Sequence, residues 1–184
     1  MIQLAVLFAI AWFISTCMSA HLPRLLQGFG LTAQAAIATA ALLGVAAVGT
    51  RLVEFTLLRH LDSLITTRVA TPMHPLGAGL LIAPGASGAP LMVIGQGAGN
   101  GMLTVAKGVL PLRLYGPSNY AYRPALLSRP AQLAQIAGPA TFGLLLERSA
   151  ALALAASSAL CLVMFAMTFG LVSTPQASTE TAPA

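Results

Sequence analysis

Six apolar segments of about 20 residues each follow one another along this chain, separated by short connections. A bilayer core is about 30 Å thick, so a helix rising about 1.5 Å per residue crosses it with about 20 apolar residues. Hydrophobic residues make up 57% of the 184 residues and charged residues only 7%, and the mean hydropathy is +0.85. Too few polar residues remain to cover the outer faces of a water-soluble domain. The sequence therefore predicts an all-α, polytopic membrane protein with six transmembrane helices.

The expected membrane spans form one bundle that occupies residues 1–172. Their approximate bounds are 2–20, 32–50, 69–87, 89–110, 130–146 and 150–172. We expect the first span to be retained rather than cleaved as a signal peptide, because no Lys or Arg precedes it. Thr32 is expected to cap the second span with its hydroxyl. The Thr-, Ala- and Pro-rich residues 173–184 are predicted to form a disordered cytoplasmic tail.

Positive charge is divided unequally between the two sets of connections. Seven of the nine basic residues fall on the side that would also hold both chain ends, whereas Arg24 and Arg148 fall on the other side. Cytoplasmic connections carry the excess of Lys and Arg. We therefore expect an integral protein of the plasma (bacterial inner) membrane with cytoplasmic N- and C-termini. Basic residues placed singly between apolar runs indicate topology signals and not a nucleic-acid interface.

The residues that intramembrane catalysis would need are scattered. Cys17 and Cys161 lie inside apolar runs, and His21, His60 and His74 are far apart in the sequence. Neither a nucleophile–base pair nor metal-ligand spacing is present, so we expect no enzymatic activity, no metal and no cofactor. No Asp or Glu falls near the middle of a span. If the chain couples to protons, the carrier is therefore His74 or a group on another chain, because proton relays in membranes use a carboxylate or His at depth.

Polar side chains inside the apolar segments are the candidates for solute binding, because such groups are costly in lipid. Gln96 and Asn100 lie four residues apart, on one face of the fourth span, and Gln132 and Gln135 form a similar pair near the start of the fifth. Each pair can contact a solute in a central cavity or, alternatively, hydrogen-bond to a neighbouring helix, at about 0.6–2 kcal/mol each. We assign Gln96, Asn100 and Gln135 to a predicted substrate site.

Four glycines alternate along the fourth span: Gly95, Gly97, Gly99 and Gly101. The run lacks both the third glycine and the preceding strand that a dinucleotide-binding loop needs. Glycines four residues apart are typical of close helix packing in membranes. We therefore assign these glycines to helix packing.

Two pairs of opposite charge follow the second span. Arg51 and Glu54 are three residues apart, as are Arg59 and Asp62. On a helix that continues out of the membrane, the members of each pair would be neighbours. Arg51 and Glu54 are predicted to gate the pathway by locking one conformation and releasing in another, with a plain solvated loop as the alternative. Lys107 is expected to snorkel to the cytoplasmic interface or, alternatively, to reach an anionic solute.

Two stretches resemble a known transporter family. Residues 49–54 (GTRLVE) follow a Gly/Ala-rich span, and residues 97–101 (GAGNG) lead to residues 107–112 (KGVLPL). They are similar to parts of the C-terminal half of a major facilitator superfamily (MFS) transporter. The first resembles the end of the eighth helix of that fold, and the second resembles the tenth helix with the connection after it. The resemblance covers about residues 1–172 and implies that the six spans correspond to helices seven to twelve.

The resemblance implies transmembrane transport of a small solute by alternating access, with efflux as the expected direction. Transporters of this family have two six-helix halves, and this chain supplies one. The expected partners are therefore the lipid bilayer, the solute, and a second six-helix half or further copies of the chain; no nucleic-acid partner is expected. A non-transporting membrane fragment, or an assembly or regulatory subunit, is the alternative, and a truncated or internally started product would fit it.

Overall fold

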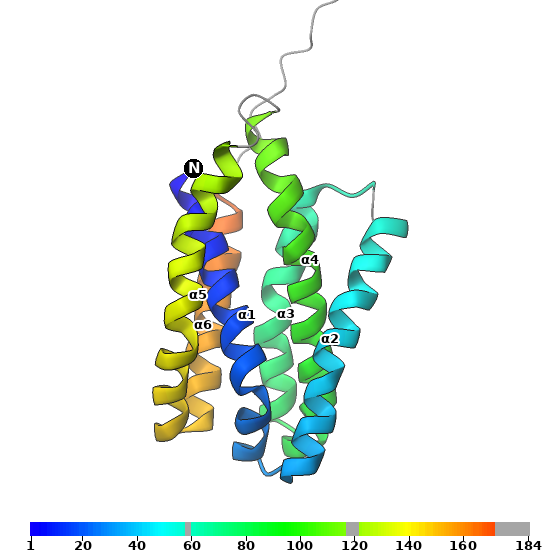
Figure 1. The fold of residues 1–184 in the computed structure, drawn as a ribbon. Helices are drawn as coiled ribbons and strands as arrows, with labels where there is room; N and C mark the ends of the chain where they lie inside the picture. The colour runs from blue at the N-terminus through cyan, green and yellow to red at the C-terminus, as the bar shows by residue number, and fades with distance from the viewer. Residues whose placement is uncertain (58–59, 117–121, 172–184) are drawn as a thin grey trace, which may run out of the picture.

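A computed structural model describes residues 1–57, 60–116 and 122–171 (Figure 1). These residues form six α-helices and one short 3₁₀ helix, and no strand occurs among them. The elements are α1 (Ile2–Gly28), α2 (Ala33–Thr56), α3 (Ser63–Ile82), η1 (Gly85–Gly88), α4 (Ala89–Tyr115), α5 (Tyr122–Arg148) and α6 (Ala150–Thr168). The all-α prediction is confirmed for this part of the chain. The predicted tail, residues 173–184, lies outside the described residues.

Three of these helices, α1, α2 and α6, are long and apolar enough to cross a membrane, which supports a membrane-embedded protein. The number of helices agrees with the six predicted segments, whereas six membrane spans are not confirmed, because only three of the described helices are apolar enough. The other three carry charged residues that we had expected to lie in connections. Arg68 lies inside α3, Arg113 inside α4 and Arg129 inside α5, and such side chains lower the hydropathy of these helices.

The helices extend beyond the apolar segments that predicted them. The residues expected to connect the first two spans are helical as far as Gly28, and those after the second span are helical as far as Thr56. Pro23 lies inside α1 and Pro111 inside α4, where we had expected the helices to have ended. Hydropathy marks the residues that match lipid, whereas a helix continues for as long as its backbone hydrogen bonds do, so the pattern placed the helix ends too early.

Side chains cap the beginnings of three helices. Thr32 caps α2 as predicted, since its hydroxyl accepts a hydrogen bond of 3.3 Å from the amide of Ala35. Asp62 caps α3 by accepting from the amide of Leu64 at 2.8 Å, and Ser149 caps α6 in the same way. Each cap satisfies an amide that has no partner within its helix. These residues therefore fix where the chain turns back into the bundle.

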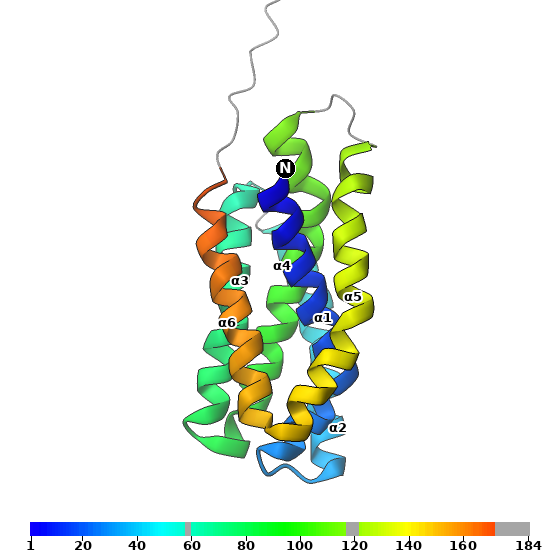
Figure 2. The ribbon, with the colours of Figure 1, turned by 90° about the vertical axis from the view of Figure 1, so that its left-hand side faces the viewer.

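The six helices run alternately up and down, so α1 begins and α6 ends at the same end of the bundle (Figure 2). Helix α1 packs against α5 and α6, α4 packs against α2 and α3, and α3 meets α6 between these two groups. The pattern nearly maps onto itself when the first three helices are exchanged with the last three. The pair α1–α5 becomes α4–α2, α1–α6 becomes α4–α3, and α1–α2 becomes α4–α5. The matched pairs differ in extent, since α3 packs far more extensively on α4 than α6 does on α1, and α5–α6 lacks a comparable counterpart in α2–α3.

The buried core is built mainly from α1 and α4, which bury ten and thirteen of their residues. Helix α2 buries only three, Ala36, Ala47 and Glu54, and exposes large apolar side chains such as Val45 and Phe55. Water is a poor solvent for such a surface, whereas lipid or another apolar protein face is a good one. Helix α2 therefore lies at the periphery of the bundle, against whatever surrounds it.

Candidate functional site

The alternating glycines place α4 at short distance from two neighbours. A Cβ atom added to Gly97 or Gly101 would lie 2.5 or 2.6 Å from a backbone oxygen of α2. One added to Gly99 would lie 2.8 Å from a backbone oxygen of α3, and one added to Gly95 would lie 3.2 Å from another. Odd-numbered glycines thus face α2 and α3 in turn and let both backbones approach, which is how small residues act in membrane helices.

A polar stripe runs along the face of α4 that the glycines leave free. It consists of Asn100, Thr104 and Lys107, which recur at helical spacing and are each half-buried. The Thr104 hydroxyl donates a hydrogen bond of 2.8 Å to the Asn100 carbonyl, and Nη2 of Arg51 on α2 donates to the Thr104 hydroxyl at 3.3 Å. The structure thus brings the predicted residues Arg51 and Asn100 to the same part of α4.

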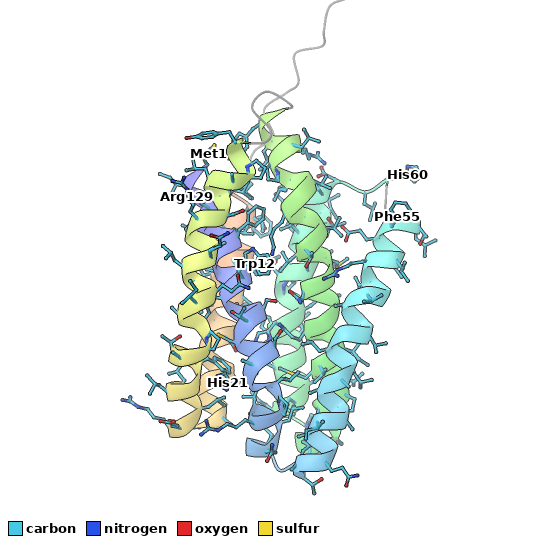
Figure 3. All side chains as sticks on the ribbon, in the orientation of Figure 1. Met1, Trp12, His21, Phe55, His60 and Arg129 are labelled. Atoms are coloured by element: carbon cyan, nitrogen blue, oxygen red, sulfur yellow. The ribbon has the colours of Figure 1, made fainter. Side chains whose placement is uncertain are left out.

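Lys107 lies against an aromatic ring. Its Nζ atom is 2.8 Å from the centroid of the Trp12 indole, which projects from α1 toward α4 (Figure 3). The Arg51 guanidinium reaches Thr104, one helical turn before Lys107, so both positive charges lie on the same part of α4. Whether Lys107 reaches the cytoplasmic interface or an anionic solute stays a prediction. Sequence reasoning missed Trp12, although it is the one Trp of the chain and lies in the middle of an apolar segment, whereas membrane Trp residues favour the interfaces.

Gln96 is separated from the stripe. Its side chain is 5% exposed and lies beside the buried imidazole of His74 on α3, whereas Asn100 is half-exposed. The Nε2 atom of His74 is 2.8 Å from the hydroxyl of Ser157 on α6. That hydroxyl also forms a hydrogen bond of 3.0 Å to the Leu154 carbonyl. The Nδ1 atom of His74 has no hydrogen-bond partner among the described residues.

The third predicted substrate residue, Gln135, lies half-buried on α5. Within the described ranges it forms no hydrogen bond to Arg51, Asn100 or Gln96. The three predicted substrate residues therefore divide between three environments: the core at Gln96, the α4 stripe at Asn100, and the α5 face at Gln135. Their assignment to one solute site remains a prediction.

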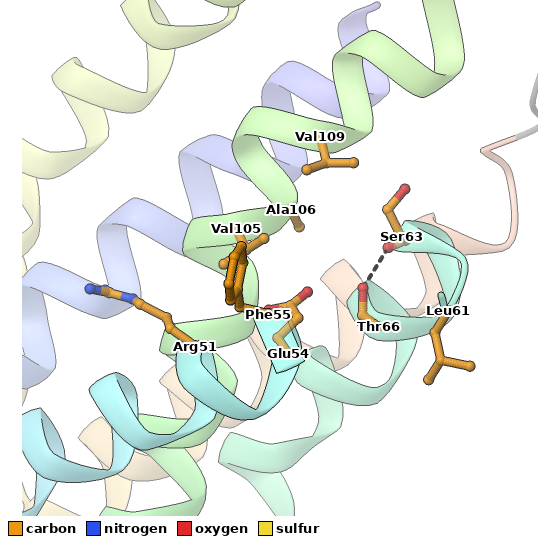
Figure 4. A pocket seen from close by; sticks show the side chains of 9 residues that line it. All are labelled: Arg51, Glu54, Phe55, Leu61, Ser63, Thr66, Val105, Ala106 and Val109. Carbon is orange, nitrogen blue, oxygen red and sulfur yellow. Dashed lines mark hydrogen bonds between the residues drawn. The ribbon is translucent and has the colours of Figure 1, made fainter. Parts of the chain in front are cut away.

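The predicted gating residues point to different helices. Arg51 reaches α4, as described above, while Glu54 turns toward Thr66 on α3 (Figure 4). No ion pair joins Arg51 to Glu54 in the described part of the chain. The second expected pair stays a prediction, because Arg59 lies outside the described residues; Asp62 forms an ion pair with Arg113 on α4. The structure therefore links α3 to α4 by charge, and α2 to α4 through a hydroxyl.

Glu54 lines a pocket between α2, α3 and α4. The pocket has a volume of about 260 Å³ and mostly apolar walls, including Phe55, Val105 and Val109 (Figure 4). Glu54 is 8% exposed, and its Oε2 atom has no hydrogen-bond partner among the described residues; the same holds for Oγ of Ser63, which also lines the pocket. A buried carboxylate oxygen without a partner is costly, so this end of α2 is held in place at the expense of stability.

Compared with protein-family models and with curated proteins, the chain matches none. The described residues contain no group of three or more His, Cys, Asp or Glu side chains that could hold a metal ion. Fold and geometry together define a helical membrane protein with a polar face on α4, to which α1 contributes an indole and α2 a guanidinium.

Proposed function

We propose that this chain is one six-helix half of a transporter of the MFS type, and that all six helices cross the membrane. The supporting observation is the set of helix pairs that pack together, which nearly maps onto itself when α1–α3 are exchanged with α4–α6, although the paired contacts differ in extent. Three helices per repeat reverse the direction of the next repeat, and inverted three-helix repeats occur within each half of such transporters. In this proposal α1 and α4 are equivalent helices, and both contribute to the polar face.

The end of the bundle that holds Met1 is the cytoplasmic end in this proposal. Met1 and Arg129 lie at that end, and Arg113, near the end of α4, lies there too (Figures 1 and 3). Arg24 and Arg148 lie toward the opposite end, where α1 and α5 finish. An excess of basic residues marks the cytoplasmic side of the plasma membrane. Both chain ends are therefore assigned to the cytoplasm.

A small solute would contact the α4 stripe, and alternating access would expose that stripe to each side in turn. Asn100 would bind the solute, with Gln135 contributing from α5. The hydrogen bond from Arg51 to Thr104 would act as a latch that joins α2 to α4, because a polar contact between helices can form in one conformation and break in another. A second six-helix half, or a second copy of the chain, would complete the pathway.

Flux measurements test this proposal. The full chain would be reconstituted in proteoliposomes, alone and with any co-purifying membrane partner, and the exchange of a panel of radiolabelled small metabolites measured. We expect exchange above that of empty liposomes, and its loss in Asn100→Ala at unchanged abundance. Flux at background in both preparations would contradict the proposal.

A second function is supported by the exposed apolar side of α2. Ile37, Val45 and Phe55 are 62%, 69% and 79% exposed. A helix with such a face can pack against another membrane protein, as the helix of an assembly or regulatory subunit would. In that case Asn100→Ala and Arg51→Ala would change abundance or the co-purification of a partner and leave flux at background.

A further inference from the structure

The polar face of α4 concentrates positive charge. Lys107 belongs to this face, and Arg51 reaches it from α2. Arg51 forms a hydrogen bond to Thr104, which lies one helical turn before Lys107. Like charges repel each other, and water screens the exposed Arg51 more than it screens Lys107. Lys107 is half-buried, so water screens it only in part.

The described carboxylates do not neutralise this charge. The chain contains four acidic residues, of which three are described. Glu54 turns toward α3, Asp62 is paired with Arg113, and Glu147 lies at the far end of α5. No ion pair involves Arg51 or Lys107 within the described ranges. The two cations thus share one face without a counter-charge there.

The indole of Trp12 compensates only a part of the cost. A cation over a Trp face gains about 0.5–2 kcal/mol, whereas removing an ion from water costs several kcal/mol. Because the indole offsets only part of this cost, a ligand with negative charge would stabilise the site most. The guanidinium of Arg51 can form a two-pronged hydrogen bond to a carboxylate, and the ammonium of Lys107 acts as a point charge beside it.

We propose that Arg51 and Lys107, with Trp12 and Asn100, bind a small organic carboxylate. The inference rests on the proposed function, in which the α4 stripe is the solute face, and adds the charge class of the solute. The carboxylate lies between the two cations and draws the ammonium of Lys107 off the indole. The face of Trp12 then contacts the apolar body of the ligand, and the Asn100 amide donates to one of its oxygens.

The fluorescence of Trp12 reports on this site directly, because the chain has no other Trp. The full chain in phosphatidylcholine nanodiscs would be titrated with sodium butyrate at constant ionic strength, and in parallel with butanol and butylammonium chloride. We expect a saturable change of Trp12 emission with butyrate alone. Equal responses to all three compounds, or a response to butyrate that does not saturate, would overturn the proposal.

Variants separate binding from folding. Lys107→Gln and Arg51→Gln should each raise the half-saturating butyrate concentration about tenfold or more, because each removes a charge-assisted contact. Lys107→Arg should retain binding, and Arg148→Gln, an exposed cation at the other end, should leave it unchanged. Full binding in Lys107→Gln and Arg51→Gln would contradict the assignment. Lys107→Arg shows whether any loss reflects charge rather than fold.

Two further measurements are needed. One distinguishes a soluble anion from a lipid headgroup, and the other distinguishes failure of the carboxylate site from failure of the proposed transport. Replacing part of the lipid with phosphatidylglycerol should leave the butyrate response in place. Its disappearance would assign the site to a lipid headgroup and overturn the soluble ligand. Saturable butyrate binding without flux in proteoliposomes would contradict the proposed transport function but not the carboxylate site. Flux of a cationic or neutral solute without butyrate binding would count against this inference alone.

Discussion

His74 on α3 and Ser157 on α6 form a hydrogen bond of 2.8 Å in the buried core, 83 residues apart in the sequence. Both side chains are nearly fully buried, at 3% and 1% exposed. Since the Ser157 hydroxyl also donates to the Leu154 carbonyl, it satisfies two partners at once. Removing it would leave Nε2 of His74 buried without its partner, in addition to the unpartnered Nδ1.

Ser157→Ala is therefore expected to destabilise the protein by about 1–3 kcal/mol, the usual cost of leaving one buried polar group unpaired. The free energy of unfolding in detergent, or the midpoint of thermal unfolding, measures the change. Ser158→Ala is the matched control, because the neighbouring hydroxyl is buried and has no hydrogen-bond partner in the described part of the chain. It should change stability little or raise it. Equal losses in both variants would contradict a specific role for the bond.

The close approach of α4 to α2 predicts strict limits at Gly97. A methyl group there would lie 2.5 Å from the Leu43 carbonyl oxygen and 2.8 Å from Cβ of Ala46. Gly97→Ala should therefore force the two helices apart and cost about 1–3 kcal/mol, as overpacking does. Lower abundance in membranes and a lower unfolding midpoint would record the effect.

Gly44→Ala on α2 provides the control for this prediction. A methyl group at Gly44 meets nothing within 4 Å, and the position is exposed. Ala favours a helix over Gly by about 1 kcal/mol, so the variant should be as stable as the parent or more so. If Gly97→Ala were tolerated as well as Gly44→Ala, the close α2–α4 contact would be wrong.

Much of the fold could be predicted because the number and length of the apolar segments set the number of helices. The six segments correspond to six helices, and Thr32 caps α2 as expected. Helix ends could not be predicted in the same way. Pro23 and Pro111 suggested ends, yet a proline removes only one backbone hydrogen bond, and the helices continue through both.

The candidate site was harder to predict because it depends on which helices meet. Spacing placed Gln96 and Asn100 on one face, but it could not indicate that α3 would cover Gln96 while Asn100 stays half-exposed. Spacing also favoured Arg51 and Glu54 as a pair on one helix. The structure gives Arg51 a partner on α4, a contact set by tertiary packing that no local pattern encodes.

Asp62 performs two roles that substitution can separate. It caps α3 by accepting from the Leu64 amide, and it forms an ion pair with Arg113 on α4. Asn caps helices about as well as Asp, so Asp62→Asn removes mainly the ion pair. Because both side chains are about one-third exposed, this should cost at most about 1 kcal/mol.

Asp62→Ala removes the cap as well and should cost about 1 kcal/mol more. Unfolding measured in low and in high salt would separate the two contributions, because only the ion pair is screened. A loss in Asp62→Asn as large as that in Asp62→Ala would mean that the ion pair, and not the cap, holds the start of α3.

The proposed orientation predicts which positions a membrane-impermeant maleimide can reach. Single cysteines would be introduced by Arg24→Cys and Arg129→Cys in a background that lacks Cys17 and Cys161. Both target positions are exposed, and they lie toward opposite ends of the bundle. In intact cells we expect labelling of the cysteine at position 24, and of the cysteine at position 129 only after permeabilisation.

The reverse result would invert the assigned orientation. Labelling of both from the same side would contradict helices that cross the membrane alternately, because α1 and α5 then could not carry these two positions to opposite faces.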